Sequence, residues 1–419
     1  MTKLAGKRTL VVLLALGLLS LALPGAGQAR SQTLPVVSIS ADSLTDWQGK
    51  ADVRPAVLSY EDAASGLRFI EPITIHIQGV SSAKFDKKNF TVKLARKLEL
   101  RAGWGAHKKY CLKANYIDPT HACNIVSARL AASMQRCYGL FEHAPNAGVV
   151  DGFPVWVVLN GEPAGLYTWN IPKDEWMLGL DKNNENHIAM FGESWEDNVV
   201  FFESDWQNFQ KGWVFEVGEA NAENKAKFKR LYQFVRDATD EEFRANADQY
   251  LDLDACFNYY CFMCVSYAPD NRGKNILLVT RDGQRWAPTL YDLDSLWGID
   301  WKGTGLWDAY EEIDLDTVIQ CRGLFGRIRD CFPEEVRARY AELRQYPLSR
   351  ANIRAEFERF RAEIPEEYYE MDKALWYPND DYIRSYERMY SLLDEYLPRV
   401  DAAFGFVEAP ETNGDDLPQ

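Results

Sequence analysis

The segment from Tyr267 to Gly298 constrains the fold and the chemistry of this chain more than any other. It begins with a polar loop in which Asp270 is followed five residues later by Asn275. The apolar run at 276–280 predicts a strand, and Arg-Asp-Gly at 281–283 predicts a hairpin turn. The segment therefore predicts a loop that carries an acid and an amide and leads directly into a β-hairpin.

The second strand of this hairpin, expected at 285–291, is followed by Asp292 and Asp294. Period-2 alternation would place these two carboxylates on one face of an extended segment. Phosphoryl transfer from a nucleotide uses such parts in this order, with one carboxylate to accept the hydroxyl proton and an amide and an acid to bind Mg²⁺. The spacing from Asp270 to Asn275 equals that of a protein-kinase catalytic loop. Because Asp and Asn are common in turns, a turn and hairpin without catalytic role is the alternative.

The N-terminus predicts export from the cytoplasm. Three basic residues precede the continuous apolar run 9–23, and small residues at 25–29 provide a cleavage site after Ala29. This run fits a secretory signal peptide at 1–29 better than a membrane-spanning helix, which needs about 20 apolar residues. Since no other segment of the sequence is long and apolar enough to cross a bilayer, we expect a secreted protein without a stable membrane anchor after cleavage.

The formal net charge of −15 bears on the choice of partner. Nucleic-acid binding needs dense Lys and Arg, so an acidic surface argues against a nucleic-acid partner and against docking on anionic lipid. It suits a basic protein substrate, although acidity also simply keeps a protein soluble. The 13 Trp and 21 Tyr residues leave open a glycan-binding or glycan-cleaving surface protein, which would need paired acids beside an aromatic groove.

The hydrophobic patterning predicts an α+β protein with two differently built parts. Period-2 patterns, with a hairpin signal at Asn160-Gly161, predict a strand-rich N-terminal lobe over 30–170. Helical patterns dominate 171–405 and predict a helical C-terminal lobe, which contains a polar insertion or flap at 181–225. Residues 406–419 predict a polar tail.

The eight cysteines do not by themselves indicate a metal or redox site. Cys261 and Cys264 resemble a C-x-x-C pair, but they lie in an aromatic helical stretch, which favours packing thiols. Cys321 and Cys331 could bridge a helical pair, because an exported protein permits disulfides. With five His residues and no His cluster, the sequence does not favour a zinc site.

Taken in order, the motifs resemble the CotH-type kinases (spore coat protein H), a secreted branch of the atypical protein-kinase-like fold. The resemblance covers roughly residues 34–405 and rests on four segments. These are GVSSAKFDKKNFTVK at 79–93, LKANYIDPT at 112–120 followed by Asn124, LNGEPAGLY at 159–167, and the unit at 270–298. The resemblance implies a two-lobed fold and ATP-dependent phosphorylation of Ser or Thr in an exported, cell-surface or spore-coat protein, with Mg²⁺ or Mn²⁺ as the metal.

Site roles follow from the resemblance residue by residue. Asp270 matches the catalytic-loop acid of the family, and Asn275 matches its metal-binding amide. Asp292 and Asp294 match the D-x-D motif after the hairpin, and we favour Asp292 as the principal metal ligand.

The resemblance also implies a phosphate-binding turn. Gly79, Ser81 and Ser82 lie in the segment that replaces a glycine-rich loop, where backbone N–H groups can cradle phosphates. The phosphate-binding lysine has three candidates, Lys88, Lys93 and Lys113. Each of them could equally be an ordinary surface charge.

Two departures from the family pattern bear on activity. Many members have Arg-Asn where this chain has Cys123-Asn124, and many have a Glu after the strand that ends near Trp169. If that Glu orients the lysine, then Asp174 or Glu175 must substitute for it, or the ion pair is missing. A catalytically silent kinase-like module for binding or coat assembly is therefore the alternative function.

Overall fold

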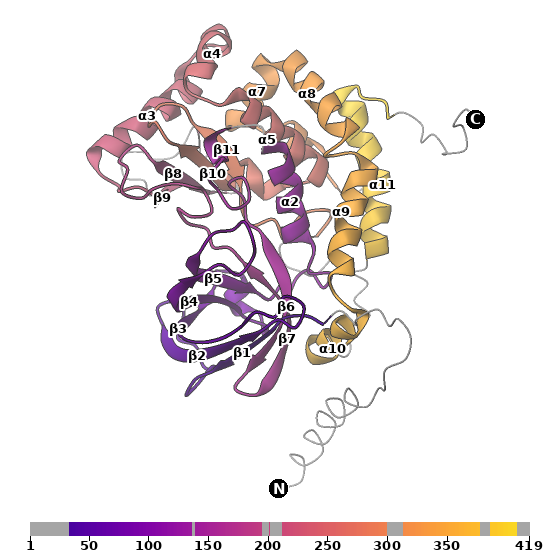
Figure 1. Cartoon of the computed structure of the whole chain (residues 1–419). Helices are drawn as coiled ribbons and strands as arrows, with labels where there is room; N and C mark the ends of the chain where they lie inside the picture. Colours follow the sequence, from indigo (N-terminus) through magenta and orange to yellow (C-terminus); the bar gives the residue numbers. More distant parts are fainter. Residues whose placement is uncertain are drawn as a thin grey trace, which may run out of the picture. The chain divides into compact units, whose positions relative to one another are not determined.

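The first half of the described chain contains a closed barrel of seven strands (Figure 1). The computed structural model describes residues 33–135, 139–194, 201, 212–299, 313–377 and 386–408. Around the barrel the strands follow the order β1 (Val36–Ser40), β2 (Arg54–Glu61), β3 (Arg68–Gln78), β4 (Asn89–Leu98), β5 (His107–Lys113), β7 (Glu162–Asn170) and β6 (Gly152–Leu159). Neighbouring strands are antiparallel except β1 and β6, which pair in parallel and close the barrel.

Alternating side chains explain why these segments form a barrel. Ile73, Ile75 and Ile77 on β3 are all buried, whereas Thr74 between the first two is exposed and His76 between the last two is partly exposed. Burying alternate residues of each strand gives the barrel an apolar interior. The period-2 prediction for this strand is therefore confirmed.

The hairpin between β6 and β7 has the predicted turn. Asn160 and Gly161 both have positive φ angles, of 50° and 84°. A type I′ turn requires this conformation at both central residues, and Asn and Gly adopt it more readily than other residues. The turn fixes the register in which β6 and β7 pair.

A second sheet lies outside the barrel and contains the hairpin predicted from the sequence. Its strand order is β11 (Ala287–Leu290), β10 (Lys274–Thr280), β8 (Ile188–Glu193) and β9 (Trp213–Val217), with all pairs antiparallel. The range 181–225, expected as an insertion or flap, thus contributes two strands that extend the hairpin into a sheet.

Helices make up most of the remainder of the described chain. They are α2 (Cys123–Gln135), α3 (Ala222–Asp237), α4 (Asp240–Asn246), α5 (Leu253–Ser266), α6 (Asp316–Ile319), α7 (Gly323–Cys331), α8 (Pro333–Gln345), α9 (Arg350–Ala362), α10 (Glu366–Trp376) and α11 (Tyr386–Phe404), with short 3-10 turns η2 (Ser82–Lys84), η3 (Gly139–Phe141), η5 (Ala247–Gln249) and η6 (Pro269–Arg272). Several begin at side-chain caps, such as Asn221 before α3 and Thr239 in a capping box before α4.

The buried helix α5 carries three of the cysteines. Nearly all of its residues are buried, and it packs against α8 and β11. Within the described residues, which exclude Cys137, every cysteine is a buried free thiol. Cys261 and Cys264 are therefore packing thiols, as expected, and the considered bridge between Cys321 and Cys331 is not formed.

The mixed α and β content confirms the predicted α+β class. Residues 33–419 form one compact unit, in which α10 contacts β7 of the barrel (Figure 1). In the part of the chain that is described, no helix combines the length and the apolar character needed to cross a bilayer. The predicted signal peptide at 1–29 lies outside this part.

Candidate active site

The loop at 270–275 is joined to the residues that follow β11 by hydrogen bonds. The buried side chain of Asn271 donates through Nδ2 to the carbonyl oxygens of Tyr291 at 3.2 Å and Asn275 at 3.4 Å. The backbone N–H of Tyr291 donates to the carbonyl oxygen of Asn275 at 3.0 Å. Asn275 is thus held opposite Tyr291, and Tyr291 is the residue that immediately precedes Asp292.

Two residues at this junction adopt the left-handed conformation. Asn275 has φ 60° and Asp292 has φ 57°, which are unusual for residues other than glycine. Strained backbone of this kind concentrates at functional sites, where the surrounding structure maintains it. Because β11 ends at Leu290 and Asp292 is left-handed, the sequence expectation of an extended D-x-D segment is wrong.

The D-x-D acids nevertheless meet a lysine from the barrel. Lys113, the last residue of β5, places Nζ 3.6 Å from Asp292 Oδ1, and its side chain is only 13% exposed. Burial acts to lower the pKa of Lys113, but the acidic groups of Tyr291, Asp292 and Asp294 outweigh it and raise that pKa above its usual value. The lysine is therefore held as a cation facing two acids.

The other two candidate lysines do not reach this cluster. Lys88 donates through Nζ to the backbone oxygens of Ala83, at 3.0 Å, and of Phe85, and so closes the turn that precedes it. Lys93 is exposed on β4. Among the three lysines that the sequence left open, Lys113 is the one beside the D-x-D acids.

Asp294 lies in a more desolvated position than an ordinary carboxylate. Burial and the charge of Asp292 raise the pKa of Asp294 to about 7, against the opposing effect of Lys113. Two acids that repel each other in this way favour a proton or a cation between them. This is the electrostatic setting that a divalent metal would relieve.

The first turn of α2 supports the D-x-D segment. Asn124 Oδ1 accepts a hydrogen bond from the backbone N–H of Leu293 at 3.1 Å. Asp118 Oδ2 accepts from the N–H of Cys123 at 2.8 Å and so caps the helix that carries Asn124. Asn124 follows one of the family-like segments, but the sequence gave no signal that it binds the acidic segment.

The Gly79 turn approaches the same cluster. Gly79 has φ 103°, a backbone conformation that favours glycine. Ser82 lines a small cavity of about 20 Å³ together with Lys113, Asn124 and Asp294, whereas Ser81 is exposed. This volume holds about one water molecule, which is too small for a phosphate group.

Asp270 lies on the same loop as Asn275 but makes a different ion pair. Its partly exposed carboxylate is 3.2 Å from Nζ of Lys274, the first residue of β10. The structure therefore brings Lys113, Asp292 and Asp294 together directly. The backbone hydrogen bond between Asn275 and Tyr291 holds Asn275 beside the D-x-D segment. Asp270 lies five residues before Asn275 on the same loop.

Neither acid proposed to replace the family Glu contacts a candidate lysine. Asp174 pairs with Lys109 at 2.8 Å and with His107 at 3.6 Å. Glu175 lies 3.7 Å from Lys182. Neither acid therefore substitutes for the family Glu, which leaves the other possibility, that this ion pair is missing. The acid that faces Lys113 is Asp292 of the D-x-D motif.

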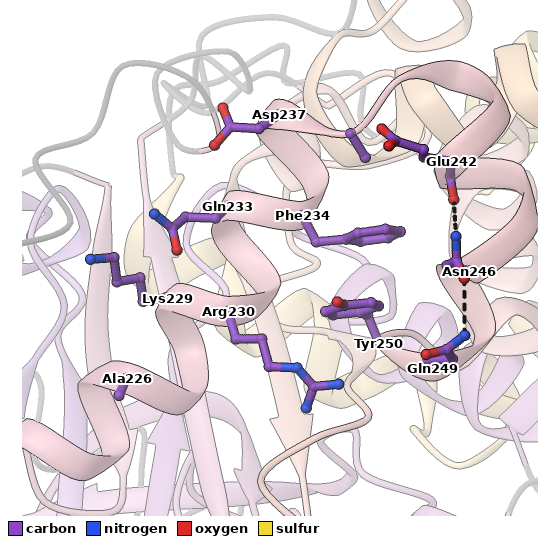
Figure 2. Close-up of a pocket in the computed structure, with 11 residues that line it drawn as sticks. Ala226, Lys229, Arg230, Gln233, Phe234, Asp237, Glu242, Asn246, Gln249 and Tyr250 are labelled. Atoms are coloured by element: carbon purple, nitrogen blue, oxygen red, sulfur yellow. Dashed lines mark hydrogen bonds between the residues drawn. The ribbon is translucent and has the colours of Figure 1, made fainter.

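A larger groove of about 710 Å³ lies between α3 and α4, and none of the predicted site residues lines it (Figure 2). Its centre is the stacked pair Phe234 and Tyr250, with ring centroids 3.9 Å apart. Arg230 lies over the Tyr250 ring at 4.6 Å. These contacts join α3 to the residue that follows η5. The two acids that line the groove are already engaged, Asp237 with Arg236 and Glu242 with the backbone N–H of Thr239.

Together, a barrel lysine, paired acids after a hairpin and an amide on a strained loop define a candidate phosphoryl-transfer site. The family model described as CotH kinase protein matches residues 75–397, and the chain belongs to this family. A search of curated proteins gave no match. The resemblance stated from the motifs is thereby confirmed, and membership indicates a kinase-like function.

The donor atoms at the site fit Mg²⁺ bound together with a nucleotide. Within the described residues, no group of three or more His, Cys, Asp or Glu side chains is placed to hold a metal ion. Mg²⁺ typically uses one or two carboxylates plus substrate phosphates and waters, rather than a complete protein cage. Asp292 and Asp294, with Asn275 nearby, match that smaller requirement.

Proposed function

We propose that this chain is an exported, ATP-dependent protein kinase that phosphorylates Ser or Thr of a secreted, cell-surface or spore-coat protein. The barrel and the helical part would act as the two lobes of an atypical kinase-like fold. The observation that carries the proposal is the cluster of Lys113, Asp292 and Asp294, in which one ammonium group faces two acids. Such a cluster suits a metal ion bound together with a polyphosphate, because the acids attract the cation and the ammonium group attracts the phosphate oxygens.

Each residue of the site has a distinct role in this proposal. Asp292 and Asn275 would hold Mg²⁺ or Mn²⁺, which when bound neutralises charge on the phosphate oxygens. Lys113 would donate a charge-assisted hydrogen bond to a phosphate oxygen. Asp270 would accept the proton of the substrate hydroxyl, and release from Lys274 would leave its carboxylate available. Gly79 and Ser82 would provide the phosphate-facing turn.

One observation favours a catalytically silent binding module instead. The cavity shared by the Gly79 turn and Asp294 has room for about one water molecule, and Asp270 is already paired with Lys274. A fold that never opened there would bind partners without transferring phosphate. ATP- and Mg²⁺-dependent thermal stabilisation separates the two functions, because only an opening site gains stability from the nucleotide.

The direct test is incubation of the purified protein with labelled ATP and Mg²⁺ or Mn²⁺. A basic, Ser-rich peptide serves as acceptor, since the chain is acidic, and self-labelling is followed in parallel. Asp248→Ala, at an exposed acid on η5, is the matched control for loss of a carboxylate. Label on Ser or Thr supports the proposal. The absence of both label and nucleotide binding in the wild-type protein would refute it.

A further inference from the structure

Lys173 is a second lysine at the D-x-D site, and the sequence did not single it out. It lies in the connection that leaves the barrel after β7. Its Nζ is 2.9 Å from Oε2 of Glu216 on β9 and 3.2 Å from the centroid of the Phe191 ring on β8. Its side chain is 16% exposed, so this ammonium group is largely shielded from solvent.

Lys173 and Lys113 both lie near the ring that precedes the metal-binding acids. Nζ of Lys173 is 5.0 Å and Nζ of Lys113 is 6.0 Å from the Tyr291 ring centroid. Burial lowers the pKa of Lys173, while Glu216 and Asp292 act in the opposite direction. The charge of Asp292 therefore acts on both lysines.

A purely structural role explains this arrangement poorly. A largely buried ion pair often contributes little net stability, because desolvation of both groups offsets their attraction. The cluster also contains more acid than base, since Lys113 and Lys173 face Asp292, Asp294 and Glu216. A bound metal would reverse that balance and leave two ammonium groups available to an incoming anion.

On the basis of the proposed kinase function, we infer that Lys173 contacts the polyphosphate of the nucleotide, alongside Lys113. Glu216 holds the ammonium group of Lys173 near the Tyr291 ring before the nucleotide binds. The phosphate then competes with Glu216 for that ammonium group. Lys113 reaches the site from the barrel and Lys173 from the connection that follows it, so both lysines can bind one chain of phosphates.

The test compares the KM for ATP of three variants, measured with Mg²⁺ in the labelling assay. Lys173→Met keeps an aliphatic stem over Phe191 and removes the charge, so KM for ATP should rise about 10- to 100-fold, as expected for a lost charge-assisted hydrogen bond. Glu216→Gln should lower KM for ATP, because a competing carboxylate is gone. Lys182→Met is the matched control, since Lys182 pairs with Glu175 on the same connection but is 67% exposed.

The outcomes separate this inference from the function on which it rests. A wild-type protein that neither binds nor uses ATP would refute the proposed function and this inference together. A wild-type protein that uses ATP, with a Lys173→Met variant whose KM stays within about 3-fold of the wild-type value, would refute the inference alone. A change of about 3-fold is smaller than the loss expected for one charge-assisted hydrogen bond. An equal rise of KM in Lys173→Met and Glu216→Gln would show a structural ion pair and would also refute it. Lys173→Arg, which retains the charge, should restore most of the affinity and excludes misfolding as the cause.

Discussion

A buried ion pair between α10 and the barrel gives the sharpest stability prediction. Lys87 Nζ lies 2.7 and 3.0 Å from the two carboxylate oxygens of Asp372, and it also donates to the carbonyl oxygen of Leu166 at 2.6 Å. Asp372 in turn accepts from the N–H of Leu166 at 2.8 Å and lies 3.3 Å from Nε2 of His121. Lys87 and Asp372 are 1% and 3% exposed, so water cannot replace either partner.

The perturbation is Asp372→Asn, which keeps the shape and removes the charge. Lys87 would then be a buried cation without its counter-ion, and removing one partner of such a pair costs about 3–5 kcal/mol of unfolding free energy. Replacing both partners, as Lys87→Met with Asp372→Leu, removes the unpaired charge. It also leaves the N–H and the carbonyl oxygen of Leu166, and Nε2 of His121, without these partners. Each such group that stays buried without a partner costs about 1–3 kcal/mol.

Urea denaturation followed by Trp fluorescence measures both values by linear extrapolation. Glu61→Gln is the matched control on the same barrel, because Glu61 and Arg68 form a pair whose side chains are 54% and 67% exposed. An exposed pair of this kind contributes about 0–1 kcal/mol. A loss below about 1 kcal/mol for Asp372→Asn would refute the reasoning.

Three further predictions concern the site and export. Asp270→Ala should lower turnover by about two to three decades, equivalent to about 3–4 kcal/mol, and leave ATP binding largely intact. Asp292→Ala should lose Mg²⁺-dependent ATP binding as well as turnover. Full activity in Asp270→Ala would contradict the role of Asp270. In the folded protein the pKa of Asp294 is raised to about 7. The protonated acid therefore contributes stability that is fully present below the pKa of the unfolded chain, and this contribution is lost as pH rises toward 7. Metal-free Asp294→Asn should therefore gain stability over wild type as pH rises from about 4 to 7, and a pH-independent difference in urea midpoints would count against this. Finally, N-terminal sequencing of secreted protein should begin near Arg30, and material beginning at Met1 would contradict the predicted signal peptide.

Local features of this protein were determined by the sequence itself. The buried isoleucines of β3, the positive φ angles at Asn160 and Gly161 and the Asp118 cap of α2 all depend on residues close together in the chain. Alternation, turn chemistry and capping act over a few residues, so they can be recognised without the fold. The spaced motifs likewise identified the CotH family before any geometry was available.

The choice of partner for each charged residue depended on the tertiary structure. The sequence left Lys88, Lys93 and Lys113 as open candidates. Only the tertiary structure brings the end of β5, with Lys113, beside Asp292 in the segment that follows β11. Asp372 reaches Lys87 across 285 residues, and Lys173 pairs with a glutamate on another strand. Such pairs form because chain elements distant in sequence bury the same charges together, and that burial arises only when the whole chain folds.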